Sequence, residues 1–503
     1  MANSNKVVVV VDPISTGGCV SAEAASRGYA VVALWTADLT DDFRAHVPQV
    51  AKDLQYLANV EEHATLAETA AALKAVCHDK EIVMLVVGGE SGVKLADELS
   101  EHMGLRGNGT EIKNRRDKSV QQKLVKAAGM RATRECFGTV WGSEQAAFVA
   151  KEPKPLVVKP VESCGSDGVK LCFTEEEAAA HFQHLMTTQA KCGVQGAGVI
   201  LQEFLKGKEY VIDHCSRDGV HKTTMVYVYD KRPCNGAPFV YFGMIPVEAD
   251  DPIAKQLIAY TRGVLDALGL KNGPTHGEVM MTSDGPCLVE MNCRCHGWDG
   301  AWVPLAKALT GGYTMVDLTL DAFLYPSAFE KIPDVYPKFN AAGLTVMLVS
   351  YNEGLAIGTP GFDAIRKMPS FIFLNSGLGV GSEVPVTIDL FTASGTVVLK
   401  HKDKAVVDKD VEAIRELENT NTMFEFQGHE VALGPRPGTR RRSSSFEGGG
   451  VRGLASRRRS SSFNAAAIAE ASAPKRLPVE AALFVFSLGI VAGVALERTL
   501  RRR

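Results

Sequence analysis

The stretch Thr275–Asp299 constrains the fold most strongly, because it spaces three oxygen-bearing side chains along a predicted β-hairpin. Two strand-like runs flank the turn Ser283-Asp284-Gly285-Pro286; the first carries Glu278, and the second carries Glu290 and Asn292. Residues two apart on a strand share a face, so Glu290 and Asn292 should point the same way, with Glu278 opposite them. Such a set of oxygen ligands would suit Mg²⁺, which keeps positions for water and phosphate. Ordinary solvated acids on a hairpin are the alternative.

The first 110 residues alternate between strand-like and helix-like segments. Continuously apolar runs at 6–11, 30–35 and 82–87 predict parallel strands, and helices are expected up to residue 27 and over 93–102. This alternation predicts a small doubly wound α/β domain. Its glycine-rich turns lack the G-x-G-x-x-G spacing of a dinucleotide site. Glu90 is a candidate substrate contact because it follows a strand, where open sheets bind ligands, although Ser91 beside it could simply cap the helix.

Two lysines come next, each at the start of a feature that can hold phosphate. Lys118 opens a predicted helix over 119–128, and Lys159 ends a predicted strand over 155–159. A loop rich in Gly and Ser follows Lys159, and its backbone N–H groups and hydroxyls can turn toward phosphate oxygens. The candidate phosphate contacts in this loop are Ser163, Gly165, Ser166 and Gly168. A mobile surface hairpin is the alternative.

The segment Gln202-Glu203-Phe204-Leu205 ends an apolar strand over 199–205, and the next strand begins at Gly207. An extended linker of this kind can offer backbone N–H and C=O groups to an adenine edge. Glu209, just beyond it, could accept hydrogen bonds from ribose hydroxyls. Taken alone, the segment is a strand-turn-strand.

In this order, the two lysines, the loop, the linker and the hairpin acids resemble the ATP-grasp superfamily. Within it, T-H-G-E-V followed by E-M-N-C-R-C-H-G is similar to amino-acid ligases that make dipeptides, the carnosine-synthase-like and bacilysin-type ligases. The resemblance covers about residues 6–418. It implies an ATP-dependent carboxylate–amine ligase that uses ATP and Mg²⁺ (or Mn²⁺) and joins two amino acids through an acyl phosphate.

The resemblance also implies a role for each candidate residue. Lys118 and Lys159 would hold the nucleotide phosphates under the loop, while Glu203 and Leu205 meet adenine and Glu209 meets ribose. The metal ligands would be Glu278, Glu290 and Asn292, with Arg294 steadying the acyl phosphate and His276 on the substrate side. An ATP-grasp ligase of another carboxylate, such as a purine precursor or bicarbonate, is the alternative enzyme. A non-catalytic nucleotide-binding scaffold at a membrane is the alternative from a different class.

Two features near the hairpin have a structural alternative. Cys293-Arg294-Cys295-His296 could be a soft-metal site, but no partner cysteine pair is nearby, so cysteines that fill packing positions are favoured. Trp298 and Trp302 could shape a substrate pocket or belong to the core.

The predicted fold class is α/β, with an α+β ATP-grasp core, a C-terminal β-rich domain and a C-terminal transmembrane helix. The predicted domains are an N-terminal α/β domain (1–113), the ATP-grasp domain (114–328), the β-rich domain (329–420), a disordered linker (421–477) and a membrane anchor (478–498). Strands are expected at 341–350, 371–374, 384–389 and 395–399, before a helix over 407–418.

The charge distribution indicates which partners the chain can bind, and the cysteine content indicates its cellular compartment. From Gly434 onward the chain carries fourteen Lys/Arg against four Asp/Glu, while the whole chain has a net charge of -3. A basic tail on an acidic body does not indicate a nucleic-acid-binding body. The 11 cysteines, odd in number and scattered, fit reduced intracellular thiols.

The tail contains a repeat and an apolar run. R-R-R-S-S-S-F occurs at 440–446 and again at 457–463, a sequence that suits basophilic kinases, although a solvated basic linker is the alternative. Ala481–Leu496 is an uncharged run that would span ~24 Å as a helix. We expect it to anchor the protein in a membrane, with the catalytic body facing the cytosol.

Overall fold

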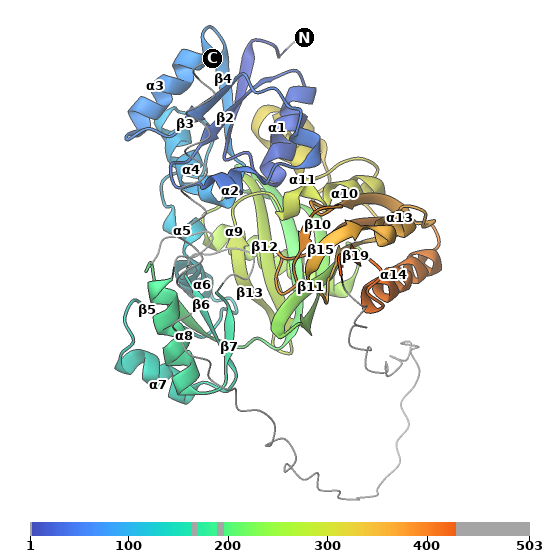
Figure 1. Ribbon diagram of the computed structural model, residues 1–503. Coiled ribbons are helices and arrows are strands. Elements are labelled where there is room, and N and C mark those ends of the chain that lie inside the picture. The colour runs from blue at the N-terminus through green and yellow to red at the C-terminus, as the bar shows by residue number, and fades with distance from the viewer. Residues whose placement is uncertain (1–2, 162–167, 189–195, 429–503) are drawn as a thin grey trace, which may run out of the picture. The chain divides into compact units, whose positions relative to one another are not determined.

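Four parallel strands form the first sheet, in the order β3-β2-β1-β4 (Figure 1). Their apolar residues pack on both faces, since Val8 and Val10 contact the α1 side and Val7 and Val9 contact the α3 and α4 side. The sequence did not predict strand β3 or helix α3. Strand β3 is only four residues long and half of them are polar, so it has no apolar run to indicate it. The elements are β1 (Lys6–Val11), α1 (Thr16–Ser26), β2 (Ala30–Trp35), α2 (Asp41–Arg44), η1 (Gln49–Ala51), β3 (Ala58–Glu61), α3 (Leu66–Cys77), β4 (Glu81–Val87), η2 (Glu90–Gly92) and α4 (Val93–His102).

A second, antiparallel four-stranded sheet follows, in the order β5-β8-β6-β7. Helices α7 and α8 cover it, and Phe182 of α8 is fully buried there. Thr174 caps α8 by accepting a hydrogen bond from the Glu177 N–H, whereas the Glu177 carboxylate accepts from the Phe173 N–H and not from the cap residue. The elements are α5 (Lys113–Arg116), α6 (Lys118–Ala127), β5 (Glu135–Gly138), α7 (Ser143–Lys151), β6 (Leu156–Pro160), β7 (Lys170–Cys172), α8 (Glu175–Thr187) and β8 (Val199–Glu203).

The central sheet has eight strands in the order β13-β12-β9-β10-β11-β14-β18-β16. The predicted hairpin forms its first edge, with β12 paired to β13 and to β9. Its turn is shorter than expected, because β13 already begins at Gly285. Its elements up to the hairpin and the helices packed nearby are β9 (Gly207–Arg217), β10 (Val220–Cys234), β11 (Ala237–Pro246), α9 (Pro252–Ala267), β12 (Gly273–Thr282), β13 (Gly285–Asn292), η3 (Trp298–Gly300), α10 (Val303–Thr310), α11 (Met315–Leu324) and α12 (Pro326–Lys331).

The C-terminal strands belong to two sheets. Strands β14, β18 and β16 extend the central sheet, and β17, β15 and β19 form a small three-stranded sheet beside them. The predicted strand over 384–389 is reduced to two residues. The elements are β14 (Ala342–Leu348), β15 (Gly354–Gly358), α13 (Pro360–Ile365), β16 (Phe371–Asn375), β17 (Glu383–Val384), β18 (Gly395–His401), α14 (Lys404–Asn419) and β19 (Glu425–Phe426).

The computed structural model describes residues 3–161, 168–188 and 196–428, and residues 1–437 make one compact unit. The predicted loop residues Ser163, Gly165 and Ser166 lie outside the described residues, as do both arginine-serine repeats and the segment Ala481–Leu496. Within the described ranges, no helix has the length and apolar character needed to cross a membrane.

Candidate active site

A cavity of about 200 Å³ collects side chains from the second sheet and from the central sheet. The second sheet contributes Lys159 and the segment from Gln202 to Leu205, and the central sheet contributes Glu209, Glu278 and Glu290. These residues are up to 131 positions apart in the chain (Lys159 to Glu290), so only the fold brings them together. The arrangement places candidate phosphate, adenine and metal contacts around one space.

The two carboxylates of the hairpin lie opposite each other across the paired strands. Glu278 on β12 is the antiparallel partner of Glu290 on β13, and His276 is the partner of Asn292. The Asn292 amide donates to the Glu290 carboxylate at 3.2 Å. Two acids and one amide therefore meet on one face of the hairpin.

The two predicted lysines reach the same acids. Lys118 begins α6 behind the cap residue Asp117, and its ammonium lies 3.0 Å from the Glu290 carboxylate. Lys159 is 6% exposed, and burial, followed by the nearby charge of Lys118, lowers its pKa. A lysine in this position gains from an anionic partner in the cavity, such as a phosphate oxygen.

Glu209 adds a third carboxylate, which interacts with Glu278 and pairs with Lys231 at 2.6 Å. Burial and the adjacent Glu278 raise the pKa of Glu209 to about 7, although Lys231 opposes the shift. Burial works against ionisation of Glu278 too, but hydrogen bonding to His276 and the charge of Lys231 lower its pKa. A divalent cation beside Glu278 would favour the ionised form of both carboxylates. The donor set therefore fits Mg²⁺.

The linker that was expected to meet adenine lines the apolar end of the cavity, together with Val157, Met280 and Val289. The Glu203 N–H already donates to the Arg134 carbonyl, so it cannot serve as the donor to adenine. The Glu203 carboxylate forms ion pairs with Arg131 and Arg134 at 2.9 and 2.7 Å. These ion pairs make the Glu203 side chain a structural group that fixes the linker.

Two further members of the predicted nucleotide site have internal partners. The Gln202 amide donates to the Thr133 hydroxyl at 2.9 Å and to Glu135 at 3.2 Å. Gly168, the one described glycine of the predicted loop, has a φ of +71° that L side chains rarely adopt. The Gly168 carbonyl lies 2.8 Å from the His181 ring nitrogen.

Arg294 lines the other end of the cavity and is held by the N-terminal domain. Its Nε lies 3.0 Å from one Glu90 oxygen, while Arg116 contacts the other Glu90 oxygen at 2.7 Å. Burial disfavours the charge on Glu90, but the two guanidinium groups outweigh it and lower its pKa. Glu90 is not among the cavity-lining residues, so the structure places it behind Arg294 and not against a substrate. Ser91 caps no helix and instead donates to Asp12.

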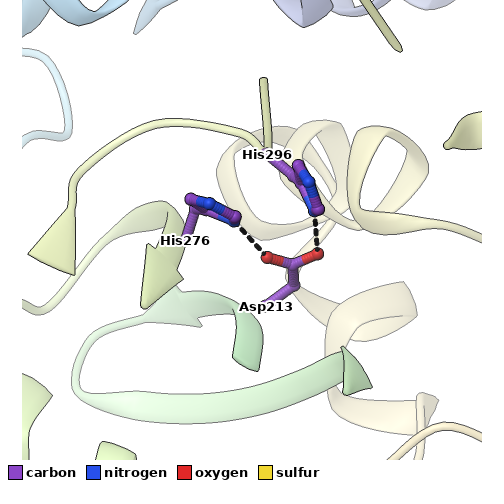
Figure 2. Close-up of side chains that lie close together, drawn as sticks. All are labelled: Asp213, His276 and His296. Carbon is purple, nitrogen blue, oxygen red and sulfur yellow. Dashed lines mark hydrogen bonds and ion pairs between the residues drawn. The ribbon is translucent and has the colours of Figure 1, made fainter. Parts of the chain in front are cut away.

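His276 and His296 converge on the buried carboxylate of Asp213 (Figure 2). Their Nδ1 atoms lie 2.9 and 3.0 Å from the two oxygens of Asp213, which are hydrogen-bond distances. The second nitrogen of His276 lies 3.4 Å from Glu278. Burial opposes protonation of His276, but hydrogen bonds to Asp213 and Glu278 raise its pKa to about 9. His276 is therefore a charged group beside the candidate metal ligands.

The remaining motif residues separate into cavity and core. Trp298 lines the cavity, whereas Trp302 is 1% exposed and belongs to the core. Cys293 and Cys295 are buried, and burial raises the pKa of both thiols, as expected of cysteines that fill packing positions. The nine cysteines within the described residues are all free and buried.

Sequence reasoning missed several residues that line the cavity. The Lys231 ammonium lies 4.9 and 4.4 Å from the ring centroids of Tyr229 and Tyr241, two rings that meet edge to face. Tyr229 and Lys231 alternate along β10, and this spacing was the one available signal. The missed residues are Tyr229, Lys231, Phe239, Tyr241, His296 and Leu390.

Known proteins resemble this chain in part of its sequence and in its fold. Residues 152–301 match the model of the ATP-grasp domain. Dapdiamide A synthase of Enterobacter agglomerans is 25% identical over 420 residues, which cover 83% of this chain and 96% of that protein. Alanine–anticapsin ligase of Bacillus subtilis is 28% identical over 243 residues, covering 45% of this chain and 50% of that one. The crystal structure of an L-amino acid ligase from Bacillus licheniformis superposes with a TM-score of 0.65 at 16% identity, over 85% of this chain and 100% of that chain.

Proposed function

We propose that the two substrates of this chain are amino acids. The premise is that the chain is an ATP-grasp enzyme, an ATP-dependent carboxylate–amine ligase that uses Mg²⁺. The relatives named above support this choice, since their names refer to dapdiamide, to alanine and anticapsin, and to L-amino acids. The observation that carries the proposal is the cavity itself. It joins the lysines and acids of the candidate nucleotide site to Arg294, His276 and Trp298 in one space.

The first step would transfer the γ-phosphoryl group of ATP to the carboxylate of one amino acid. A carboxylate oxygen attacks phosphorus, and the bond to the bridging oxygen of ADP breaks. Both reactants are anionic, so Lys118, Lys159 and Arg294 would stabilise the approach through their charge. Glu278, Glu290 and Asn292 would hold Mg²⁺, which neutralises phosphate charge when bound.

The second step would join the amino group of the other amino acid to the activated carbonyl. The nitrogen lone pair forms the C–N bond, and phosphate leaves with the electrons of the C–O bond. Arg294 lies where it can hold the departing phosphate, and Glu90 keeps its guanidinium in place. The acyl phosphate reacts with water, so an enclosed cavity favours amide formation over hydrolysis.

A substrate screen tests the proposal. Purified protein is incubated with ATP, Mg²⁺ and pairs of amino acids, while ADP release and the dipeptide mass are followed. We expect ADP release to require the amino acids and to match dipeptide formation one to one. ADP release with a non-amino-acid carboxylate alone would favour the other-carboxylate ligase. ATP binding without turnover on any carboxylate would favour the scaffold.

We also propose that Ala481–Leu496 anchors the protein in a membrane, with the catalytic body in the cytosol, and that kinases act on the serines of the two arginine-serine repeats. The sequence alone supports this proposal: an uncharged run follows a basic segment that an anionic membrane surface would attract. Phosphorylation of the serines would cancel much of that charge and weaken the attraction.

A further inference from the structure

His296 has no part in the steps above, yet it lines the same cavity as Arg294 and Trp298. It follows Arg294 by two residues, just after β13 ends. Its ring nitrogen Nδ1 lies at hydrogen-bond distance from Asp213 (Figure 2), so Nε2 is the ring nitrogen left to accept a proton. Among the described residues, none forms a hydrogen bond with Nε2 of His296.

The imidazole ring of His296 is fixed on every side. It stacks on Trp302 at 5.5 Å between ring centroids with 24° between planes, and the Tyr227 ring lies nearly perpendicular to it, 5.7 Å between ring centroids. The His296 carbonyl accepts hydrogen bonds from the Thr16 hydroxyl and the Trp302 indole. The buried carboxylate of Asp213 then selects the tautomer with hydrogen on Nδ1 and the lone pair on Nε2.

Burial keeps the His296 ring neutral. Burial lowers its pKa to about 4, the charge of Asp213 opposes this shift, and the charges of His276 and Arg294 add to it. His296 thus keeps a basic lone pair at neutral pH.

We propose that His296 is the base that accepts a proton from the attacking amine, an inference that rests on the proposed ligase function. As the amine nitrogen bonds to the acyl carbon, it becomes positively charged, and one N–H proton moves to Nε2. The C–O bond to phosphate breaks with its electron pair on phosphate. Asp213 stabilises the resulting imidazolium, which afterwards returns the proton to solvent or to phosphate. A nitrogen that carries positive charge is strongly acidic, so a weakly basic acceptor suffices.

The test separates the two half-reactions with hydroxylamine. Hydroxylamine is a much weaker base than an amino acid and attacks acyl phosphates at neutral pH without needing a base. In H296N the Asn side chain can still donate to Asp213 but cannot accept the proton. We expect H296N to form the hydroxamate at the wild-type rate while dipeptide formation falls by about 10²-fold or more.

H221N is the matched control, because His221 also bonds a carboxylate, Asp266, at 3.2 Å but lies outside the cavity. We expect H221N to keep both reactions. Wild-type dipeptide formation by H296N would overturn the inference. If H296N loses both reactions, H296Q is measured in the same way, and equal loss of both reactions there would overturn it as well. Failure of the wild-type protein to form any hydroxamate would instead count against the proposed function.

Discussion

At the scale of single residues, the candidate site balances carboxylates against ammonium groups within one cavity. Lys118 pairs with Glu290 and Lys231 pairs with Glu209, while Glu278 contacts the charged ring of His276. Each carboxylate therefore has a cation in place before any nucleotide arrives. When nucleotide phosphates and Mg²⁺ enter, the lysines can turn to phosphate while the acids turn to the metal.

The first prediction concerns the charge of Glu290. Glu290→Gln keeps the side-chain size and leaves an oxygen for Asn292, but it removes one negative charge from the predicted metal site. We expect amino-acid-dependent ADP release to fall about 100-fold or more, because a catalytic metal contributes several kcal/mol. A titration of the rate with Mg²⁺ should show weaker metal binding, so that a higher Mg²⁺ concentration is needed for the half-maximal rate. Glu101→Gln, on the exposed face of α4, is the control, and an unchanged rate in Glu290→Gln would contradict the assignment.

His214 gives a prediction for pH dependence. It is fully buried, and both of its ring nitrogens lack hydrogen-bond partners among the described residues. Burial, with the nearby charges of Arg262 and His221, lowers its pKa from 6.5 to about 3. Below pH 6.5 the unfolded chain therefore binds a proton that the folded chain rejects, so the free energy of unfolding falls as the pH falls toward 3.

Replacing this histidine should remove that loss. Between pH 7 and pH 5 we expect His214→Leu to gain about 2 kcal/mol in free energy of unfolding relative to the wild type. Denaturant unfolding at several pH values measures the difference. His184→Leu, at an exposed position of α8, should show no such gain. A difference between His214→Leu and wild type that stays constant over this range would show that His214 titrates normally.

At the scale of elements, one side chain joins the helix of Lys118 to the strand of the predicted metal ligands. The Gln121 amide of α6 donates to the Met291 carbonyl at 2.9 Å and accepts from the Met291 N–H at 3.0 Å. Met291 stands between Glu290 and Asn292. This pair of hydrogen bonds therefore sets the distance between a phosphate-type lysine and the acids that face it.

Gln121→Met keeps the length of the side chain and removes these two hydrogen bonds and a third, from the Gln121 amide to the Arg115 carbonyl. Two buried backbone groups of Met291 then lose their partners, so we expect the free energy of unfolding to fall by about 2 to 4 kcal/mol. We also expect the KM for ATP to rise, because α6 is no longer held against β13. Gln183→Met, exposed on α8, controls for the substitution itself. Loss of stability without any change in KM would show that α6 stays in place without the clamp.

The sequence predicted local elements better than their pairing. The shared face of Glu290 and Asn292 followed from their two-residue spacing, and β1, β2 and α4 followed from apolar patterns, whereas the hairpin register, with its shift after Glu278, did not. The extension of the central sheet by β14 could not be predicted, because an apolar strand does not specify its partner. The β11–β14 pairing joins residues about 100 positions apart.

The same distinction holds for the candidate site. Ordered motifs identified Lys118, Lys159 and the hairpin acids, and the structure brings the described members to one cavity. Lys231 lies between Asp230 and Arg232. From the sequence alone, three charged residues in a row look like the solvent-exposed part of a strand. Only the pairing of β10 with β9 turns its ammonium toward Glu209. His296 was considered only as part of the Cys293–His296 motif, which suggested a soft-metal site, and its place in the cavity was not predicted.

At the scale of the whole molecule, the candidate site depends on three parts of the chain. The N-terminal domain supplies Glu90, which holds Arg294; the second sheet supplies Lys159; and the central sheet supplies the acids. All of these lie within residues 1–437, which form one compact unit. A ligand that contacts the second and the central sheet should therefore stabilise this unit as a whole, through preferential binding to the folded state.

The last prediction separates this unit from the basic tail. A chain that ends at Gly428 keeps every described site residue and loses the fourteen Lys/Arg and the apolar run that follow Gly434. We expect it to release ADP with amino acids at the rate of the full chain, because the catalytic chemistry needs no residue of the tail. Full-length protein should float with vesicles that contain phosphatidylserine, whereas the shortened chain should not, since the remaining body is acidic. Full-length protein that stays bound to the vesicles at high salt would indicate insertion of Ala481–Leu496. Release of the protein from the vesicles by salt would indicate charge attraction alone. Equal flotation of both chains would place membrane binding in the body and contradict the proposed anchor.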